Sequence, residues 1–282
     1  MTLFIYIIII MNNFEKVKYF NQTFGILTND VYDANIFTNK WGVVKYRLDL
    51  INEEINELID GCKKNDFLEV LDSICDILYV TYGKAITLGI NLESEFKQRF
   101  IKSDKTNFEL VKELLASQDD GSQFTGKLEE SYIGAIREIA EQMKETFNKL
   151  EYTCKHSQNE SVEATQKIIT DLLLDITHSC YHIGCLIKID VDYAFNLVHE
   201  ANMTKACKTE QEAMETVEKY LQEKENFIGD EEYPYQFPSY KLSSDGKYFI
   251  IFNDDKRENP KFAGKILKSK NWQEPNFSEF KV

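Results

Sequence analysis

Proline is almost absent from this sequence. The 282 residues contain only four prolines, and all of them lie in the last fifty positions. A proline costs about 3 kcal/mol in the interior of a helix, so a long proline-free span is compatible with long helices. An all-β sandwich or barrel needs turn residues about every ten positions, and these are missing here. The absence therefore favours a mainly α-helical fold.

Basic residues, cysteine pairs and long apolar runs are also scarce. The chain has 33 Lys and Arg against 47 Asp and Glu, a formal net charge of -14, and no run of basic residues. Such a chain repels nucleic-acid phosphates, so we expect no nucleic-acid partner. The six cysteines form no CxxC pair, which is typical of reduced cysteines in a cytoplasmic protein. The apolar run at residues 1–10 is about half a membrane span, so we expect an N-terminal extension and no membrane attachment.

Apolar residues recur at helical spacing through most of the chain. The pattern predicts helices at residues 13–24, 43–63, 66–89, 92–117, 128–152, 161–187, 190–204 and 209–226. Turn residues at 119–122 separate two helical modules, residues 11–117 and residues 118–229. We therefore expect a mainly α-helical bundle.

The composition changes in residues 230–282, which contain all four prolines. The segment Lys247–Asn253 has the composition of a β-strand. A second strand at Ala263–Lys268 could pair with it across a turn that contains Asn259 and Pro260. We therefore predict a small C-terminal β-hairpin appended to the helical body.

The two helical modules resemble each other at an offset of 99 residues. Six positions match, with Asp72, Asp76, Ile77, Tyr82, Ile90 and Phe96 in the first and Asp171, Asp175, Ile176, Tyr181, Ile189 and Phe195 in the second. Aligning Glu54 and Glu57 with Glu138 and Glu141 needs an offset of 84 and places Arg137 opposite Glu53. Two interpretations stay open. One is a tandem duplication with a degenerate second copy, which would let one chain imitate a dimeric bundle; the other is a long helical insertion.

Acidic residues gather on two neighbouring predicted helices. Glu54 and Glu57 are three positions apart on the first helix and flank its apolar stripe. Four acids share one face of the next helix, which is otherwise apolar: Asp66, Glu69, Asp72 and Asp76. Clustered carboxylates repel each other when buried, and a hard divalent cation such as Mg²⁺ removes that penalty. Asp66 lies at the helix start, where the helix dipole favours an acid, so we leave it out of the site.

These residues resemble the MazG-like all-α nucleoside triphosphate pyrophosphohydrolases, and within them the phosphoribosyl-ATP pyrophosphohydrolase-like branch. The resemblance lies in Glu53-Glu54-x-x-Glu57, in the acids Glu69, Asp72 and Asp76, and in the run Ile77–Gly83. The segments Asn13–Gly25, Ile189–Lys205 and Gly264–Ser269 are also similar to that branch. One position departs from the family pattern. Ser73 stands three residues before Asp76, where the signature has a glutamate, and Glu69 with Asp72 satisfies the spacing one turn earlier.

The resemblance implies an enzyme that uses Mg²⁺, with Mn²⁺ as an alternative, to cleave an NTP or dNTP between its α- and β-phosphates. It assigns Glu54, Glu57, Glu69, Asp72 and Asp76 to the metal, Glu53 or Glu57 to the proton of the attacking water, and Asn202 and Lys205 to the substrate. It also implies a homo-oligomer, most simply a dimer. A phosphoribosyl-ATP hydrolase and a dUTP or dCTP hydrolase are alternatives within this class. A non-catalytic nucleotide-sensing protein with relic acids is the alternative outside it, and Ser73 is the feature that keeps it open.

Overall fold

The structure is a computed structural model that describes residues 11–99, 105–116, 130–228, 232–257 and 264–280. The chain separates into two compact units. The first comprises Met1–Lys18, Leu27–Val198 and Asn276–Val282, and the second comprises Tyr19–Ile26 and His199–Pro275. Helices α2 (Asn13–Phe24) and α10 (Val191–Met203) contribute residues to both units. Within the described part of the chain, none of the helices combines the length and the apolarity that a bilayer span requires.

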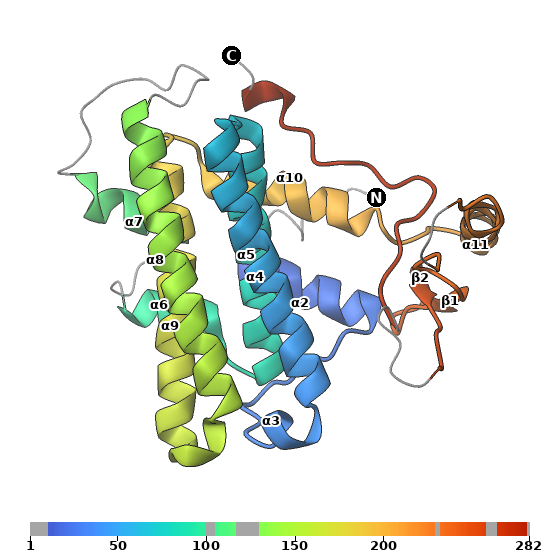
Figure 1. Ribbon diagram of the computed structural model, residues 1–282, viewed down its shortest axis with the longest axis horizontal. Coiled ribbons are helices and arrows are strands. Elements are labelled where there is room, and N and C mark those ends of the chain that lie inside the picture. The colour runs from blue at the N-terminus through green and yellow to red at the C-terminus, as the bar shows by residue number, and fades with distance from the viewer. Residues whose placement is uncertain (1–10, 100–104, 117–129, 229–231, 258–263, 281–282) are drawn as a thin grey trace. The chain divides into compact units, whose positions relative to one another are not determined.

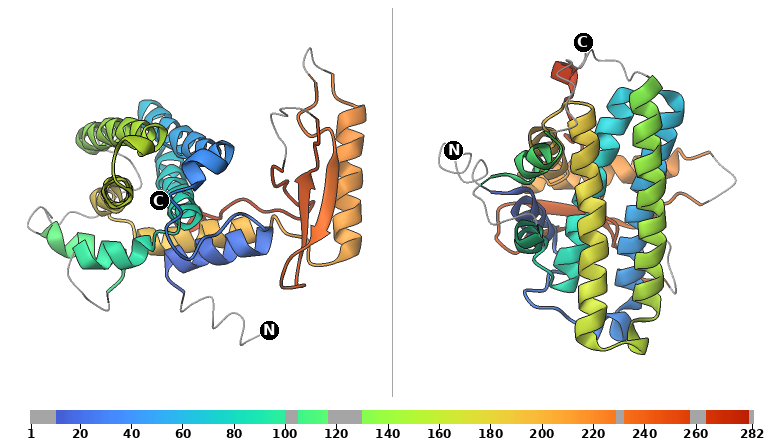
Figure 2. Two further views of the ribbon diagram at one scale, coloured as in Figure 1. Left: turned by 90° about the horizontal axis from the view of Figure 1, so that it is seen from below. Right: turned by 90° about the vertical axis from the view of Figure 1, so that its left-hand side faces the viewer.

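Four long helices form the body of the first unit (Figures 1 and 2). They are α4 (Trp41–Lys64), α5 (Phe67–Leu88), α8 (Glu130–Lys155) and α9 (Val162–Leu186). Helices α4 and α9 each pack against both α5 and α8. The apolar stripe of α4 faces this packing, because Ile51, Ile55 and Leu58 are completely buried. The predicted α-helical bundle is therefore confirmed.

The prediction of one continuous helix over residues 92–117 is wrong. The structure has α6 (Leu92–Arg99) and, after residues that lie outside the described ranges, α7 (Asn107–Leu114). Thr106 starts α7, because its hydroxyl accepts from the backbone N–H of Glu109 while the Glu109 carboxylate accepts from the backbone N–H of Thr106. This capping box is a helix-start signal that apolar spacing alone does not reveal. The short helix α3 (Ile36–Asn39) was not predicted either.

The second unit contains a helix and a two-stranded sheet. Helix α11 (Glu210–Glu225) packs against the strands β1 (Pro238–Leu242) and β2 (Phe249–Asn253). The strands are antiparallel, with Tyr240 opposite Ile251. Side chains from the helix and the sheet share one buried cluster, which includes Cys207, Ala213, Tyr220, Ile251 and Leu267.

The small C-terminal sheet is confirmed, and so is the predicted pairing of its last segment. The ladder partner of β2 is β1, which was not predicted. The segment predicted at Ala263–Lys268 also lies against β2, through an antiparallel bridge between Ile266 and Phe252 and a backbone bond from the Leu267 N–H to the Ile251 carbonyl. Pro238 is tolerated because it is the first residue of its strand, where its missing N–H costs little. The predicted turn at Asn259 and Pro260 lies outside the described residues.

Two sets of equivalent contacts relate the first half of the helical unit, residues 13–99, to its second half, residues 107–198. The Asn13 side-chain amide donates to Asp192 at 2.6 Å and to the Tyr181 hydroxyl at 3.3 Å. The Asn107 amide makes the equivalent bonds, to Glu93 at 2.7 Å and to the Tyr82 hydroxyl at 3.4 Å. Each asparagine therefore bonds to the opposite half.

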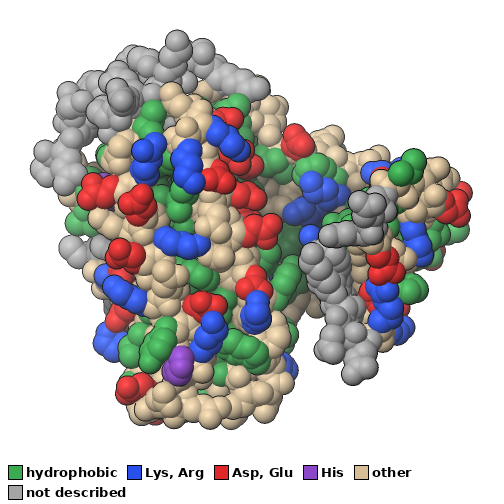
Figure 3. Space-filling model, in the orientation of Figure 1, with side chains coloured by type: hydrophobic (Ala, Val, Ile, Leu, Met, Phe, Trp, Pro, Cys, Tyr) green, Lys and Arg blue, Asp and Glu red, His purple; other side chains and the backbone are tan. Residues whose placement is uncertain are grey.

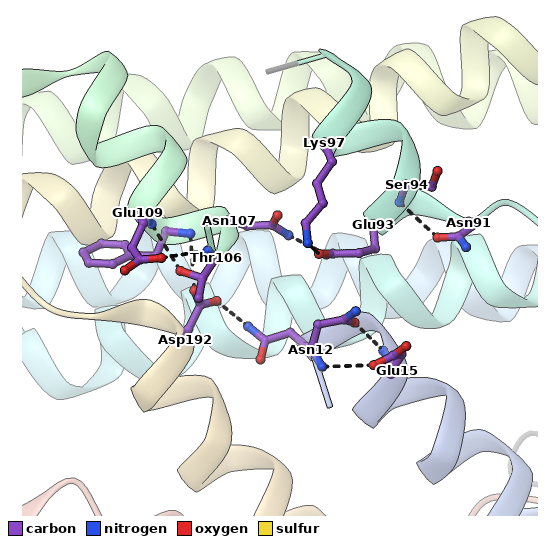
Figure 4. A network of polar contacts seen from close by, with 12 residues as sticks. Asn12, Glu15, Asn91, Glu93, Ser94, Lys97, Thr106, Asn107, Glu109 and Asp192 are labelled. Carbon is purple, nitrogen blue, oxygen red and sulfur yellow. Dashed lines mark hydrogen bonds and ion pairs between the residues drawn. The ribbon is translucent and has the colours of Figure 1, made fainter. Parts of the chain in front are cut away.

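The same relation holds for two buried tyrosines and for the starts of α2 and α7; Figure 4 shows the two helix starts. The hydroxyls of Tyr82 and Tyr181, which are 99 residues apart, lie 3.1 Å from each other in the buried centre of the network. Asn12 and Glu15 form a capping box at the start of α2, as Thr106 and Glu109 do at the start of α7. Exchanged, equivalent contacts are the signature of a two-fold interface. They support the tandem duplication over the insertion.

Candidate metal and catalytic site

A tight turn places the acidic faces of α4 and α5 next to each other. Asn65 ends α4 in the left-handed conformation, with φ 54°, and its backbone N–H bonds to the last turn of the helix. Asp66 is the N-cap of α5, since its carboxylate accepts from the backbone N–H groups of Leu68 and Glu69. The interpretation of Asp66 as a helix-start residue is therefore confirmed. The two helices run in opposite directions from this turn, so Glu57 and Glu54 lie alongside the first turns of α5.

Gly61 allows the two helices to approach closely near the turn. A Cβ atom at this position would lie 3.0 Å from Cγ of Glu69, which is tighter than an ordinary contact. Any larger residue here would displace the Glu69 side chain. Gly61 therefore fixes Glu69 against α4, close enough for its charge to raise the pKa of Glu57.

Glu54 is the most strongly perturbed carboxyl of the cluster. Burial raises its pKa to about 9, and the negative charges of four neighbours add to the effect: Asp76, Glu57, Glu53 and Asp72. Both causes disfavour the charged form of a carboxylic acid. Glu54 is therefore protonated at neutral pH in the metal-free protein. The structure brings together the acids of both predicted helices.

Glu57 and Glu53 occupy the outer side of the cluster. Both side chains are exposed, whereas Glu54, Glu69, Asp72 and Asp76 are half-buried. Burial and the charges of Glu53 and Glu69 raise the pKa of Glu57, and a hydrogen bond with Glu54 partly offsets this. Figure 3 shows that acidic side chains follow the outer face of α4.

Ser73, the departure from the family pattern, does not belong to the acidic face. Its side chain is 3% exposed and lies in the core. Asp72, the residue before it, is half-buried, and its negative charge raises the pKa of Glu54. The charge of Asp76 also raises the pKa of Glu54, and it raises the pKa of Tyr79, which lies one turn later on α5. The geometry therefore supports Asp72 and Asp76 as the acids that face α4.

The donor chemistry of the cluster fits a hard divalent cation. All its members are carboxylates, and their mutual repulsion is what a cation with oxygen ligands would relieve. In the described ranges, however, no three His, Cys, Asp or Glu side chains already converge in a geometry that could hold an ion. The carboxylates are neighbours, and a cation held by them would require changes in their rotamers.

The sequence reasoning missed two buried cations on the same pair of helices. Arg47 is 6% exposed, its Nε donates to the Thr87 hydroxyl at 3.2 Å, and its Nη2 has no partner among the residues that the structure describes. Lys84 is completely buried, and its ammonium donates to the Val44 carbonyl. Burial lowers the pKa of Arg47 to about 10 and that of Lys84 to about 8. Arg47 lies two helical turns before Glu54, so both residues are on one face of α4. This spacing could have revealed Arg47 as a neighbour of the acidic cluster.

The second half does not repeat the acidic cluster. Asp175 and Asp171, the counterparts of Asp76 and Asp72, form ion pairs of 2.8 Å with Arg99 and Lys167. Their charges are therefore balanced by side chains of the chain itself.

The predicted offset of 84 between α4 and α8 does not agree with their burial. In that alignment the buried Leu58 of α4 would correspond to the exposed Gln142 of α8. The buried positions of α4 match those of α8 at an offset of 85 or 92 instead. The counterparts of Glu54 and Glu57 are then Ile139 and Gln142, or Thr146 and Lys149, and neither pair is acidic.

The predicted substrate residues Asn202 and Lys205 belong to the second unit. The Lys205 ammonium donates to the Asn202 side-chain oxygen at 2.6 Å, next to the end of α10. A contact of either residue with a substrate held by α4 and α5 stays a prediction.

The comparison with known proteins agrees with this site. Residues 17–99, which contain all the acids of the cluster, match the family model described as phosphoribosyl-ATP pyrophosphohydrolase. This match places residues 17–99 in the MazG-like all-α nucleoside triphosphate pyrophosphohydrolase superfamily. An uncharacterized protein of Acanthamoeba polyphaga mimivirus, L479, is 34% identical to this MazG-like chain over 276 residues, which cover 95% of the chain and 94% of the viral protein. No solved structure gives a match.

Proposed function

We propose that this MazG-like protein is a divalent-cation-dependent pyrophosphohydrolase that converts an NTP or dNTP to the monophosphate and pyrophosphate. The observation that carries the proposal is the environment of Glu54, a half-buried carboxyl among four other acids on two antiparallel helices. Such a concentration of carboxylates destabilises the fold unless a cation is bound, which points to a function for it. Family membership supplies the reaction class.

We assign the residues of the cluster to metal binding and to proton transfer. A bound Mg²⁺ or Mn²⁺ would polarise the phosphates and lower the pKa of a coordinated water. Five carboxylates would hold the ion: Glu54, Glu57, Glu69, Asp72 and Asp76. Glu54 would release its proton to solvent when a cation binds, because a positive neighbour favours its charged form. Glu53 and Glu57 are exposed in front of the cluster, so one of them would accept the proton of the attacking water.

Substrate selection is a finer part of the same proposal. Phosphoribosyl-ATP is the substrate that the family description names, and dUTP and dCTP are the alternatives. Asn202 and Lys205 would contact the phosphates, since a lysine and an amide donate the hydrogen bonds that the carboxylates lack.

A second candidate is a nucleotide-binding protein without catalysis. Two observations favour it: the glutamate of the family signature is replaced by the buried Ser73, and the described carboxylates are not already arranged as a metal cage. Such a protein would bind a nucleotide and release no pyrophosphate.

A panel of NTPs and dNTPs with Mg²⁺, scored for pyrophosphate release, tests the proposal. We expect release with at least one nucleotide and a decrease of at least about a hundredfold for Glu54→Gln and Asp76→Asn. Asp175→Asn is the matched control, because Asp175 is the counterpart of Asp76 in the second half and should leave activity unchanged. Binding of a nucleotide without any release would favour the second candidate. Equal activity of wild type and Asp76→Asn would refute the assigned site.

A further inference from the structure

One face of the α4–α5 pair extends from the acidic cluster toward the far end of the two helices. Near the turn, Gly61 of α4 lies against Glu69 of α5. Far from the turn, Arg47 of α4 lies against Gly83 of α5, since a Cβ atom on Gly83 would be 3.1 Å from Nη1 of Arg47. The two contacts are fourteen residues apart on each helix, which is about four turns. They therefore share one face, and the acidic cluster and Arg47 lie along it.

The face becomes more buried in the direction of Arg47. Glu57 is exposed, Glu54 is half-buried, and Arg47 is 6% exposed. Arg47 lies seven residues before Glu54, about 10 Å along the helix axis. A ligand that is held by the acids and extends inward along this face would therefore reach Arg47 with its far end.

The Arg47 guanidinium is a buried donor that lacks an acceptor. Its Nε donates to the Thr87 hydroxyl at 3.2 Å, but its Nη2 has no partner among the residues that the structure describes. Burial lowers its pKa only to about 10, so the group is charged at neutral pH. A buried charge without a counter-charge or a full set of hydrogen bonds destabilises a fold. Its presence beside a candidate active site points to a ligand that accepts from it.

The position of the guanidinium favours a nucleobase over a phosphate as that ligand. The guanidinium contacts Gly83 and Thr87, which lie about two and three turns beyond Asp76 on α5. Phosphates on a cation held by the carboxylates would stay near Asp76, and the other end of the nucleotide is its base. Tyr79 connects the two places: burial raises its pKa, the charge of Asp76 adds to the rise, and Arg47 partly offsets it.

We propose that Arg47 is a specificity-determining residue, which donates a hydrogen bond from its guanidinium to a carbonyl oxygen of the substrate's nucleobase. This inference rests on the proposed function, because the acidic cluster and its cation hold the triphosphate. A guanidinium has donors only, so it selects uracil or guanine, which carry a carbonyl oxygen where cytosine and adenine carry an amino group. An amino group would bring two donors together and leave the guanidinium unpaired. Of the pyrimidine substrates considered above, dUTP fits Arg47 and dCTP does not.

Binding of uncleavable nucleotides to the full-length protein tests the proposal. The probes are α,β-imido analogues in two matched pairs, dUTP with dCTP and GTP with ATP, titrated with Mg²⁺ in a calorimeter. We expect the carbonyl-bearing member of at least one pair to bind at least about tenfold more tightly. Arg47→Met removes the donors and should abolish this preference by weakening only the carbonyl-bearing member. A purely structural role of Arg47 would weaken both members equally.

Lys84→Met is the matched control for the loss of a buried cation. Lys84 is completely buried on the same helix pair, but its ammonium donates to the Val44 carbonyl. The variant should keep the wild-type preference. Exchanging a buried charge for an apolar side chain is often neutral for stability, and thermal unfolding checks this. Arg47→Gln should show the same loss of preference and replaces Arg47→Met if that variant does not fold.

Four results would overturn the proposal: no binding of any analogue, equal affinity within both pairs, a preference for the amino-bearing member, or an unchanged preference in Arg47→Met. Pyrophosphate release from natural nucleotides separates this inference from the proposed function. Release together with an unchanged preference in Arg47→Met would refute the role of Arg47 alone. A preference that depends on Arg47, without release from any nucleotide, would refute the proposed catalysis alone.

Discussion

At the residue scale, the acidic cluster owes its properties to a conflict between burial and charge. Glu54 is half-buried, and its carboxyl has the raised pKa that burial and four acidic neighbours produce. The spacing of acids in the sequence predicted that these side chains would meet. It could not predict how far Glu54 is buried, because burial depends on helices that are distant in sequence. It also gave no sign that Ser73 would turn into the core, which removes it from the site.

Replacing Glu54 should stabilise the metal-free protein at alkaline pH. The folded carboxyl titrates at about 9 and the unfolded one near 4.5, so the folded state holds the extra proton between these values. Wild-type stability therefore falls as pH rises from 5 to 9, and Glu54→Gln removes that dependence. We expect Glu54→Gln to gain about 1–3 kcal/mol over wild type at pH 8, and little at pH 5.

Thermal unfolding in EDTA at the two pH values measures this difference. Glu138→Gln, an exposed glutamate on α8, is the control and should follow wild type at both. If Glu54→Gln unfolds at a lower temperature than wild type at pH 8, the folded Glu54 carboxyl does not have the raised pKa on which this prediction depends.

At the element scale, the two halves differ most at the ends of equivalent helices. Helix α5 ends at Gly89, over which the segment Leu27–Asp33 passes, and α9 ends before Lys188, which has a left-handed φ of 56°. The recurrence of Asn-Phe-Glu-x-Val-Lys at α2 and α7 was available in the sequence. Its meaning became clear only when Asn13 and Asn107 were seen to bond to opposite halves.

Gly89→Ala should therefore cost much more stability than a change at its counterpart. Its Cβ would overlap a backbone carbonyl, and φ of 77° is strained for alanine, so we expect a loss of about 3–5 kcal/mol. Lys188→Gly should change the free energy of unfolding by less than about 1 kcal/mol, because the left-handed position suits glycine. Urea unfolding compares the two variants. A similar cost for both would mean that the Leu27–Asp33 segment does not press on Gly89.

At the scale of the whole molecule, the residues that the structure describes form two related halves, of which the first carries the acidic cluster. The second half keeps two of the acids, but Arg99 and Lys167 neutralise them, and Glu54 and Glu57 have no acidic counterparts in either burial-matched alignment. The exchanged contacts of Asn13 and Asn107 join these two halves within one chain.

We expect one cation-binding site per chain as a consequence. Titration of the metal-free protein with Mn²⁺, followed by calorimetry, should show binding that Asp76→Asn weakens at least about tenfold. The counterpart variant Asp175→Asn should leave the affinity and the stoichiometry unchanged. A second set of sites that disappears in Asp175→Asn would show that the second half binds metal as well.

The sequence by itself determined the helical class, the acidic faces and the family, because each of these depends on short-range spacing. Proline-free length permits helices, and steps of three and four place acids on one face whatever surrounds them. Tertiary structure decided which acids are buried, that β1 pairs with β2, and that Asp171 and Asp175 of the second half form ion pairs. These features depend on contacts between residues about a hundred positions apart, such as Tyr82 with Tyr181, and local patterns carry no information about them.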